Sequence, residues 1–263
     1  MTASDFPRRS RIYRASFLFL LLFSPIFSTC AEEGDPYGGV TAENYITGRF
    51  QPVSHPLFVN IQSLQIPTNG RAQYLRREAA DALSSMYAAL KKSHQEIRLY
   101  VTSSTRTFYD QKAIWENKWN GRTLIEGQNI SRTIHDPLRR ALKILEYSSM
   151  PGTSRHHWGT DFDLNELYDQ YYTSGAGTAL YRWLLENAPG FGFCQPYSAG
   201  RNSGYYEEKW HWSYRPLSSR FLADWVRLNT NAHFLEQKGL FDGSDLAGKM
   251  AQTYVTSVNP DCR

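Results

Sequence analysis

Three short segments with strand-like patterns constrain the fold of this chain most. IRLYVTS alternates the apolar residues Ile97, Leu99 and Val101, DFDLN follows a polar loop, and YYEEKWHWSY is rich in aromatic residues. Helical patterns separate the three segments, but no repeating strand–helix–strand rhythm is present. We therefore predict one α+β domain rather than a parallel sheet.

Five helices are predicted around these strands. The longest begins near Arg71, where apolar residues start to recur at intervals of three or four, and ends near His94. The pair Asp136-Pro137 is typical of a helix start. In chain order, the predicted helices cover 71–94, 107–119, 136–145, 178–187 and 216–228.

The first thirty residues have the pattern of a secretory signal. Four arginines precede an apolar run at 15–27, which is short for a membrane span of about 20 residues and contains Pro25. Two kinds of cleavage fit the residues around Cys30: one by ordinary signal peptidase, and one at a lipobox that would leave a lipid anchor on Cys30. We expect an exported protein, periplasmic or associated with the cell envelope, either free or as a lipoprotein.

Charge and cysteine content limit the expected partners and compartment. Without residues 1–30 the chain has 25 basic and 24 acidic residues, and no basic stripe with interleaved aromatics is present. Nucleic acid is therefore not an expected partner. Export would place Cys194 and Cys262 in an oxidising compartment, where they are candidates for a disulfide bond. Two free thiols are the alternative.

The segment TSRHHWGTDFDLN concentrates side chains that bind metals. Catalytic zinc needs three protein ligands and one open position, and His156 and Asp163 could supply two of them. His211, in the third strand-like segment, could supply another. His157 could replace His156, and Asp161 could replace Asp163, because residues two apart lie on the same face of a strand. Spacing alone leaves these alternatives open.

Three motifs follow one another along the chain. SRHHWGTDFD fits the signature S-x-H-x-x-G-x-x-x-D, and EKWHWSY fits E-x-W-H-x-x-Y. Further upstream, the signature S-x-R-T-x-x-x-Q is matched by Ser104, Arg106, Thr107 and Gln111. Together the motifs resemble those of the LAS metallopeptidases, in particular the D-alanyl-D-alanine carboxypeptidases related to vancomycin-resistance enzymes. The resemblance covers roughly residues 70–228.

The resemblance implies a zinc site and roles for the residues around it. It implies that Zn²⁺ is bound by His156, Asp163 and His211. It also implies that Glu208 is the general base and that Arg106 stabilises the anionic transition state. In such a site zinc lowers the pKa of a water molecule toward about 7, a carboxylate takes its proton, and a cation meets the oxyanion. The implied fold is hedgehog/D,D-peptidase-like, with a small antiparallel sheet that carries the zinc site and helices around it.

Further residues are predicted to shape the site or to contact the substrate. Ser154 is predicted to hydrogen-bond the substrate or to shape the ligand loop, although serine also caps turns. Gln111 could contact the peptide or lie on a helix surface, and Trp210 could wall the metal site or belong to the core. Gly159 is expected to permit a tight backbone path.

Two patterns disagree about the general base. Two-residue alternation in YYEEKWHWSY puts Glu207 on the same face as His211, whereas the family motif places the base at Glu208. We predict Glu208, because a bend or bulge before the site can re-aim a side chain.

Two residues depart from the family pattern. Asp161 stands where a small residue is usual, and Ser213 stands where many relatives carry Arg, with Arg215 two positions later. The first could add a charge beside the metal ligands or displace Asp163, and the second could alter how a substrate carboxylate is held. These departures bear on substrate choice more than on catalysis.

The predicted function is zinc-dependent hydrolysis of the terminal D-Ala from peptidoglycan stem peptides, by a monomer. L,D-carboxypeptidase and peptidoglycan endopeptidase activities are alternatives within the same fold. A zinc-containing binding module without turnover is the alternative of another class, against which Arg106 and a candidate base argue. The predicted parts are a signal peptide at 1–30, a tether or irregular extension at 31–65, the zinc peptidase domain at 66–230, and a tail at 231–263 that a disulfide could hold.

Overall fold

The computed structural model describes Met1, residues 34–232 and residues 239–263. The predicted signal peptide and Cys30 lie outside these residues. The chain divides into two units, Met1–Pro36 and Tyr37–Arg263, and every element described below belongs to the second. In the described part of the chain, no helix is long and apolar enough to cross a membrane.

Short antiparallel strands form two sheets. The larger has four strands in the order β3-β4-β6-β5, which are β3 (Val101–Ser103), β4 (Asp161–Leu164), β5 (Phe193–Cys194) and β6 (His211–Tyr214). The smaller sheet pairs β1 (Phe58–Asn60) with β2 (Tyr74–Arg76). The predicted α+β class with a small antiparallel sheet is confirmed.

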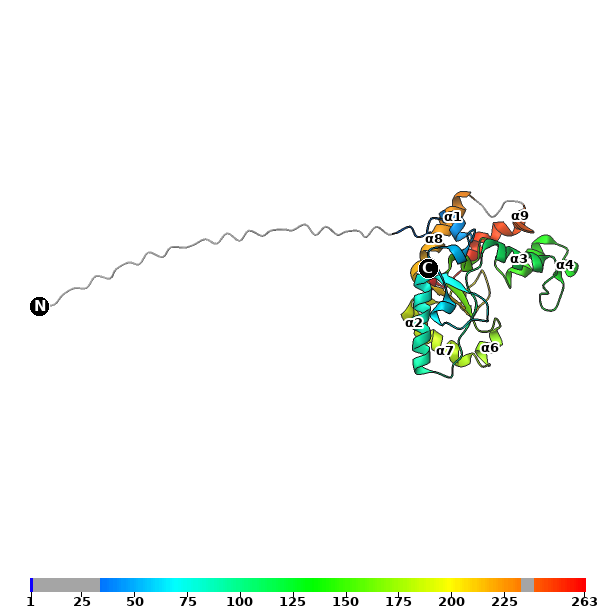
Figure 1. The fold of residues 1–263 in the computed structure, drawn as a ribbon. Coiled ribbons are helices and arrows are strands. Elements are labelled where there is room, and N and C mark those ends of the chain that lie inside the picture. Colours follow the sequence, from blue (N-terminus) through cyan, green and yellow to red (C-terminus); the bar gives the residue numbers. More distant parts are fainter. Residues whose placement is uncertain (2–33, 233–238) are drawn as a thin grey trace. The chain divides into compact units, whose positions relative to one another are not determined.

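Helices surround the larger sheet. The α-helices are α1 (Ala42–Ile46), α2 (Arg77–Ser93), α3 (Phe108–Trp119), α4 (Ile130–Thr133), α5 (Pro137–Leu145), α6 (Asp169–Thr173), α7 (Thr178–Asn187), α8 (Arg215–Ala232), α9 (Ser244–Ala247) and α10 (Ala251–Thr256). Short 3₁₀ turns are η1 (Pro52–Ser54), η2 (Ile61–Leu64), η3 (Arg155–Trp158), η4 (Ala188–Phe191), η5 (Gly248–Met250) and η6 (Pro260–Cys262). Figure 1 shows α2, α6 and α7 at one end of this unit and α1, α3, α4, α8 and α9 at the other.

The two faces of the larger sheet differ in character. Phe162, Leu164 and Trp212 pack into an apolar cluster with residues of α2 and α7. The residues that alternate with them point to the opposite face. These are buried and polar: Asp161, Asp163, His211 and Ser213. Because side chains alternate along β4 and β6, one face of the sheet packs against the apolar core and the other carries a cluster of polar side chains.

Several predicted helices are confirmed, whereas some boundaries are wrong. α3, α5, α7 and α8 lie within a few residues of their predicted ranges, and Thr107 and Asp110 form a capping box at the start of α3. The long helix begins at Arg77 rather than Arg71, because residues 74–76 pair with β1 instead. The first predicted strand is confined to β3, and the aromatic segment becomes a strand only at His211.

Both predicted flanking segments pack against the body of the unit. Residues 37–65 are not a tether, because Tyr45 and Ile46 of α1 are fully buried in an apolar cluster that also contains Trp225. Beyond the gap, residues 239–263 form α9, α10 and η6, and they add Phe241 and Val255 to the same cluster. The polar and Gly-rich composition of these segments reflects the turns between their short elements. A few buried aromatic residues pack these elements against the rest of the unit.

Candidate metal centre

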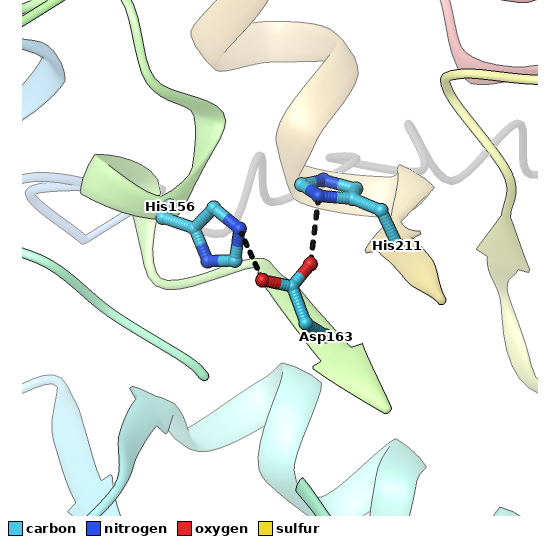
Figure 2. A group of neighbouring side chains, drawn as sticks. All are labelled: His156, Asp163 and His211. Carbon is cyan, nitrogen blue, oxygen red and sulfur yellow. Dashed lines mark ion pairs between the residues drawn. The ribbon is translucent and has the colours of Figure 1, made fainter. Parts of the chain in front are cut away.

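Three buried side chains from separate parts of the chain meet on the polar face of the sheet (Figure 2). His156 comes from η3, Asp163 from β4 and His211 from the start of β6, and one potential ligand atom of each lies within 4.8 Å of the others. Asp163 Oδ2 lies 3.3 Å from His156 Nε2, and Asp163 Oδ1 lies 3.1 Å from His211 Nδ1. The structure thus brings together the three residues that were predicted from the sequence as metal ligands.

Each histidine is held through the ring nitrogen that faces away from Asp163. His156 Nδ1 lies 2.8 Å from the backbone oxygen of Ser104, and His211 Nε2 lies 3.0 Å from Asp161 Oδ1. His156 Nε2 and Asp163 Oδ1 are buried and make no hydrogen bond within the described structure. Two imidazoles and a carboxylate with their donor atoms turned toward one another are a ligand set that fits zinc.

A tight turn leads from His156 into β4. Gly159 has a φ of +72°, in the left-handed region that favours glycine, and a Cβ there would lie 2.3 Å from Cε1 of Phe58. The indole of the preceding Trp158 is buried, and its Nε1 donates to the backbone oxygen of Ile46 at 3.1 Å. The glycine permits the turn, and the buried tryptophan anchors it to α1.

Glu208 faces the site, whereas Glu207 does not. Glu208 Oε2 lies 3.5 Å from His211 Nδ1, while Glu207 Oε2 is paired with Lys209 Nζ at 2.6 Å. Both glutamates precede β6, in a segment where the N–H of His211 closes a turn on the backbone oxygen of Glu208 at 3.3 Å. Strand alternation therefore does not apply to them, and the geometry agrees with the motif.

The surroundings of Glu208 favour proton uptake. Burial raises the pKa of Glu208 to about 7, with the charge of Asp163 adding to the rise and His211 and Arg106 opposing it. A carboxyl group with a pKa near neutrality can accept a proton and give it back at neutral pH. A dication bound nearby would lower this pKa.

The candidate ligands have shifted pKa values in the absence of a cation. Burial and the charge of Arg106 lower the pKa of His156 to about 4. Burial alone would lower the pKa of His211, but the neighbouring carboxylates of Asp161 and Asp163 raise it to about 9. Burial would raise the pKa of Asp163, but the two histidines hold it below its usual range. Asp163 is therefore ionised, as a metal ligand must be.

Arg106 lies on the other side of Asp163, with its Nη2 3.8 Å from Asp163 Oδ2. Its backbone is fixed at both ends: the N–H donates to the oxygen of His156 at 3.2 Å, and the oxygen accepts from His157 Nδ1 at 2.7 Å. The other nitrogen of His157 accepts from the N–H of Gly152 at 3.0 Å. His157 is thus a support for the Arg106 loop rather than the alternative ligand that spacing allowed.

The predicted substrate contacts occupy different environments. Ser154 Oγ is buried and makes no hydrogen bond with the described residues. Gln111 is fully buried, which contradicts a surface helix position; its Nε2 donates to the oxygen of Ser149 at 2.7 Å, while its Oε1 makes no hydrogen bond in the described part of the chain. Trp210 is half-buried, and its backbone oxygen accepts from Leu164 at 2.9 Å.

Two basic side chains near the site were not predicted from the sequence. Lys118 of α3 and Arg201 both act on the charge of Glu208. Burial, helped by the charge of Arg106, lowers the pKa of Lys118 to about 8. The one available signal was helical spacing, since Lys118 follows Gln111 by two turns of α3.

Cys194 and Cys262 form a disulfide, with an Sγ–Sγ distance of 2.07 Å. The bond joins the edge strand β5 to η6, across a sequence separation of 68. Because β5 pairs with β6, the C-terminal segment is tied to the strand next to the one that carries His211.

Comparison with known proteins identifies similar sequences. The family model described as VanY, D-alanyl-D-alanine carboxypeptidase, matches residues 72–217. A protein of Bacillus subtilis (strain 168) named "Putative carboxypeptidase YodJ" is 30% identical over 146 residues, which are 54% of this chain and 46% of that protein. A D-alanyl-D-alanine carboxypeptidase of Enterococcus faecalis is 37% identical over 68 residues, 25% of this chain and 24% of that protein. The matches thus span less than half the length of these curated relatives.

Two solved structures are also similar to this chain. The LdcB LD-carboxypeptidase is 23% identical, with a TM-score of 0.46, over 67% of this chain and 76% of that one. A mutant of the vancomycin resistance D,D-pentapeptidase VanY in complex with Zn(II) is 21% identical, with a TM-score of 0.41, over 59% and 83% of the two chains.

Proposed function

The chain belongs to the VanY family of D-alanyl-D-alanine carboxypeptidases, and we propose that it is a zinc-dependent enzyme that removes the terminal D-Ala from peptidoglycan stem peptides. The observation that carries the proposal is the meeting of His156, Asp163 and His211 with Glu208 beside them, 3.5 Å from His211 Nδ1. A carboxyl group that faces the ligand set without belonging to it suits proton transfer to and from a bound water, which a binding module without turnover does not need.

The roles of the protein groups follow from their positions. Zinc held by the three ligands would supply an acidified water molecule and a polarised scissile carbonyl. Glu208 accepts the proton of the attacking water and returns it to the departing amine of D-Ala. From its place beside Asp163, the guanidinium of Arg106 stabilises the oxyanion that forms on the carbonyl.

The charges around Glu208 suit a substrate that ends in a carboxylate. A carboxypeptidase must hold this terminal group while a buried carboxylate stands nearby. Arg106, Lys118 and Arg201 offset the negative charge of Glu208 and Asp163, and they make the approach of an anionic peptide end favourable.

We also propose that the protein acts in the cell envelope, where its substrate is. The arginine-flanked apolar run of the first thirty residues supports export. The bond between Cys194 and Cys262 supports an oxidising compartment.

The test is hydrolysis of defined stem peptides by the purified protein, read by mass spectrometry. The substrates are a pentapeptide that ends in D-Ala-D-Ala, the same peptide ending in D-Ala-L-Ala, and the tetrapeptide. We expect the terminal alanine to be released from the first alone, and only with zinc present. Release from the tetrapeptide alone would replace the proposal with L,D-carboxypeptidase activity, and no release from any peptide would overturn it.

A further inference from the structure

A buried ion pair lies behind His211, on the side away from Asp163. Arg155 Nε donates to Asp161 Oδ1 at 2.8 Å, and the two side chains are 1% and 0% exposed. The same oxygen lies 3.0 Å from His211 Nε2. Oδ1 of Asp161 thus contacts both the guanidinium of Arg155 and Nε2 of the candidate metal ligand His211.

Further contacts fix this ion pair in place. Thr160 Oγ1 donates to the second oxygen of Asp161 at 2.5 Å. Arg155 Nη2 donates to Ser213 Oγ at 2.7 Å, and Ser213 Oγ donates to Ser218 Oγ at 2.9 Å. The guanidinium also lies 4.6 Å from the ring centroid of Trp158. The orientation of Asp161 is therefore set by its contacts with Arg155, Thr160 and His211.

Strand pairing explains why Asp161 reaches the ring. In the β4–β6 register Asp161 lies opposite Ser213 and Asp163 lies opposite His211, so all four side chains share the polar face. The imidazole of His211 lies between the two aspartates, with Nδ1 toward Asp163 and Nε2 toward Asp161. A carboxylate buried there without a cation would be costly, and the charge of Arg155 offsets part of that cost.

The two histidines are therefore oriented by different means. His156 is held by the backbone oxygen of Ser104, which no side-chain substitution removes. His211 is held by a side chain, which can be changed without touching any proposed ligand. A ligand histidine whose second N–H has a fixed acceptor keeps one tautomer and one ring orientation.

We propose that Asp161, paired with Arg155, is the positioning residue that directs Nδ1 of His211 to the metal, and that the pair sets the zinc affinity of the site. The inference rests on the proposed zinc function. It also gives Asp161 a role at the position where the sequence departs from its family, and it places Ser213 in the support of Arg155 rather than at a substrate carboxylate.

The first experiment uses the wild-type protein loaded with zinc and labelled with ¹⁵N-histidine. Nuclear magnetic resonance of the imidazole groups reports which nitrogen of His211 carries the proton. We expect a proton on Nε2 that exchanges slowly with solvent, because Asp161 accepts it. A proton on Nδ1, or an Nε2 proton that exchanges as freely as that of an exposed histidine, would overturn the proposal whether or not any variant folds.

The second experiment compares zinc affinities by competition with a chromophoric chelator. The variant Arg155→Met/Asp161→Ala removes both charges together, so that neither is left buried and unpaired, and Ser218→Ala cuts the network without touching Asp161. We expect zinc to bind about 10- to 100-fold more weakly to the double variant and unchanged to Ser218→Ala. A folded double variant with wild-type affinity would refute the inference, whereas failure of the proposed function would appear as wild-type protein that binds no zinc or releases no D-Ala.

Discussion

Asp163 and His211 lie directly opposite each other in the register of β4 and β6, and Oδ1 of the aspartate is 3.1 Å from Nδ1 of the histidine. The pairing of the two strands therefore positions two of the three candidate ligands. A slip of one residue in this register would turn one of them to the apolar face. The third ligand, His156, depends instead on the turn at Gly159.

Zinc content should depend on each of the three ligands. We expect His156→Ala, Asp163→Ala and His211→Ala to lose bound zinc after dialysis, because two ligands hold the ion far less tightly than three. The measurement is elemental analysis of protein shown to be folded by circular dichroism. His94→Ala, at an exposed histidine, is the control and should keep its zinc. Full zinc content in all three variants would rule out this centre.

Replacing the base should remove activity and spare the metal. We expect Glu208→Gln to lower kcat by about 10²- to 10⁴-fold, since the amide cannot take a proton, while zinc content stays the same. Glu207→Gln is the matched control, because its carboxylate pairs with Lys209 instead. The reverse result, with Glu207→Gln as the inactive variant, would move the base to Glu207.

Replacing Arg106 should lower kcat without preventing the protein from folding. We expect Arg106→Gln to lower kcat by about 10²- to 10³-fold, as does loss of one group that stabilises an oxyanion. Steady-state kinetics on the pentapeptide check this, with zinc content measured in parallel. Arg98→Gln, at an exposed arginine, should behave as wild type. Unchanged kcat in Arg106→Gln would remove Arg106 from the mechanism.

The affinity for zinc should rise with pH. In the metal-free protein the pKa of His211 is raised to about 9, so its ring is protonated at neutral pH and must lose a proton when Nδ1 binds the ion. His156, with a pKa of about 4, is already neutral and adds no dependence there. Above about pH 7.5, where Glu208 is already ionised, one released proton predicts an association constant that rises about tenfold per pH unit and levels off near pH 9. A flat profile between about pH 6.5 and 8 would contradict the protonated His211.

Loss of the disulfide should cost stability more than catalysis. We expect Cys194→Ser/Cys262→Ser to lower the free energy of unfolding by about 2–5 kcal/mol, because the bond closes a long loop of the unfolded chain. Denaturant unfolding of both proteins gives the difference. The kcat of the folded variant should be close to that of wild type, since neither sulfur contacts the metal centre. Equal stability with and without the bond would show that β5 and η6 need no covalent tie.

Local chemistry allowed part of this structure to be predicted from sequence. Alternation in DFDL correctly put Asp161 and Asp163 on one face, and the pair Asp136-Pro137 correctly predicted the start of a helix. The family motif correctly placed Glu208 beside His211, where alternation did not, because the strand begins only at His211. Each correct prediction depended on residues close together in the chain or on a fixed register.

Contacts between distant segments could not be predicted. Nothing near Asp161 in the sequence shows that Arg155 folds back to pair with it, or that Ser213 supports that arginine from 58 positions away. The buried position of Gln111 likewise could not be predicted, because its partner Ser149 lies on another segment of the chain. Such pairings depend on the packing of whole elements, which no local pattern encodes.

The match to the family ends at residue 217, yet the fold around the site does not. The backbone oxygen of Gly48 accepts the first N–H of α3 at 2.7 Å, and Trp225 Nε1 donates to the oxygen of Gly152 at 2.8 Å. The contacts that hold the site therefore extend beyond the residues that the family model matches. A fragment limited to residues 72–217 would lack both of these contacts.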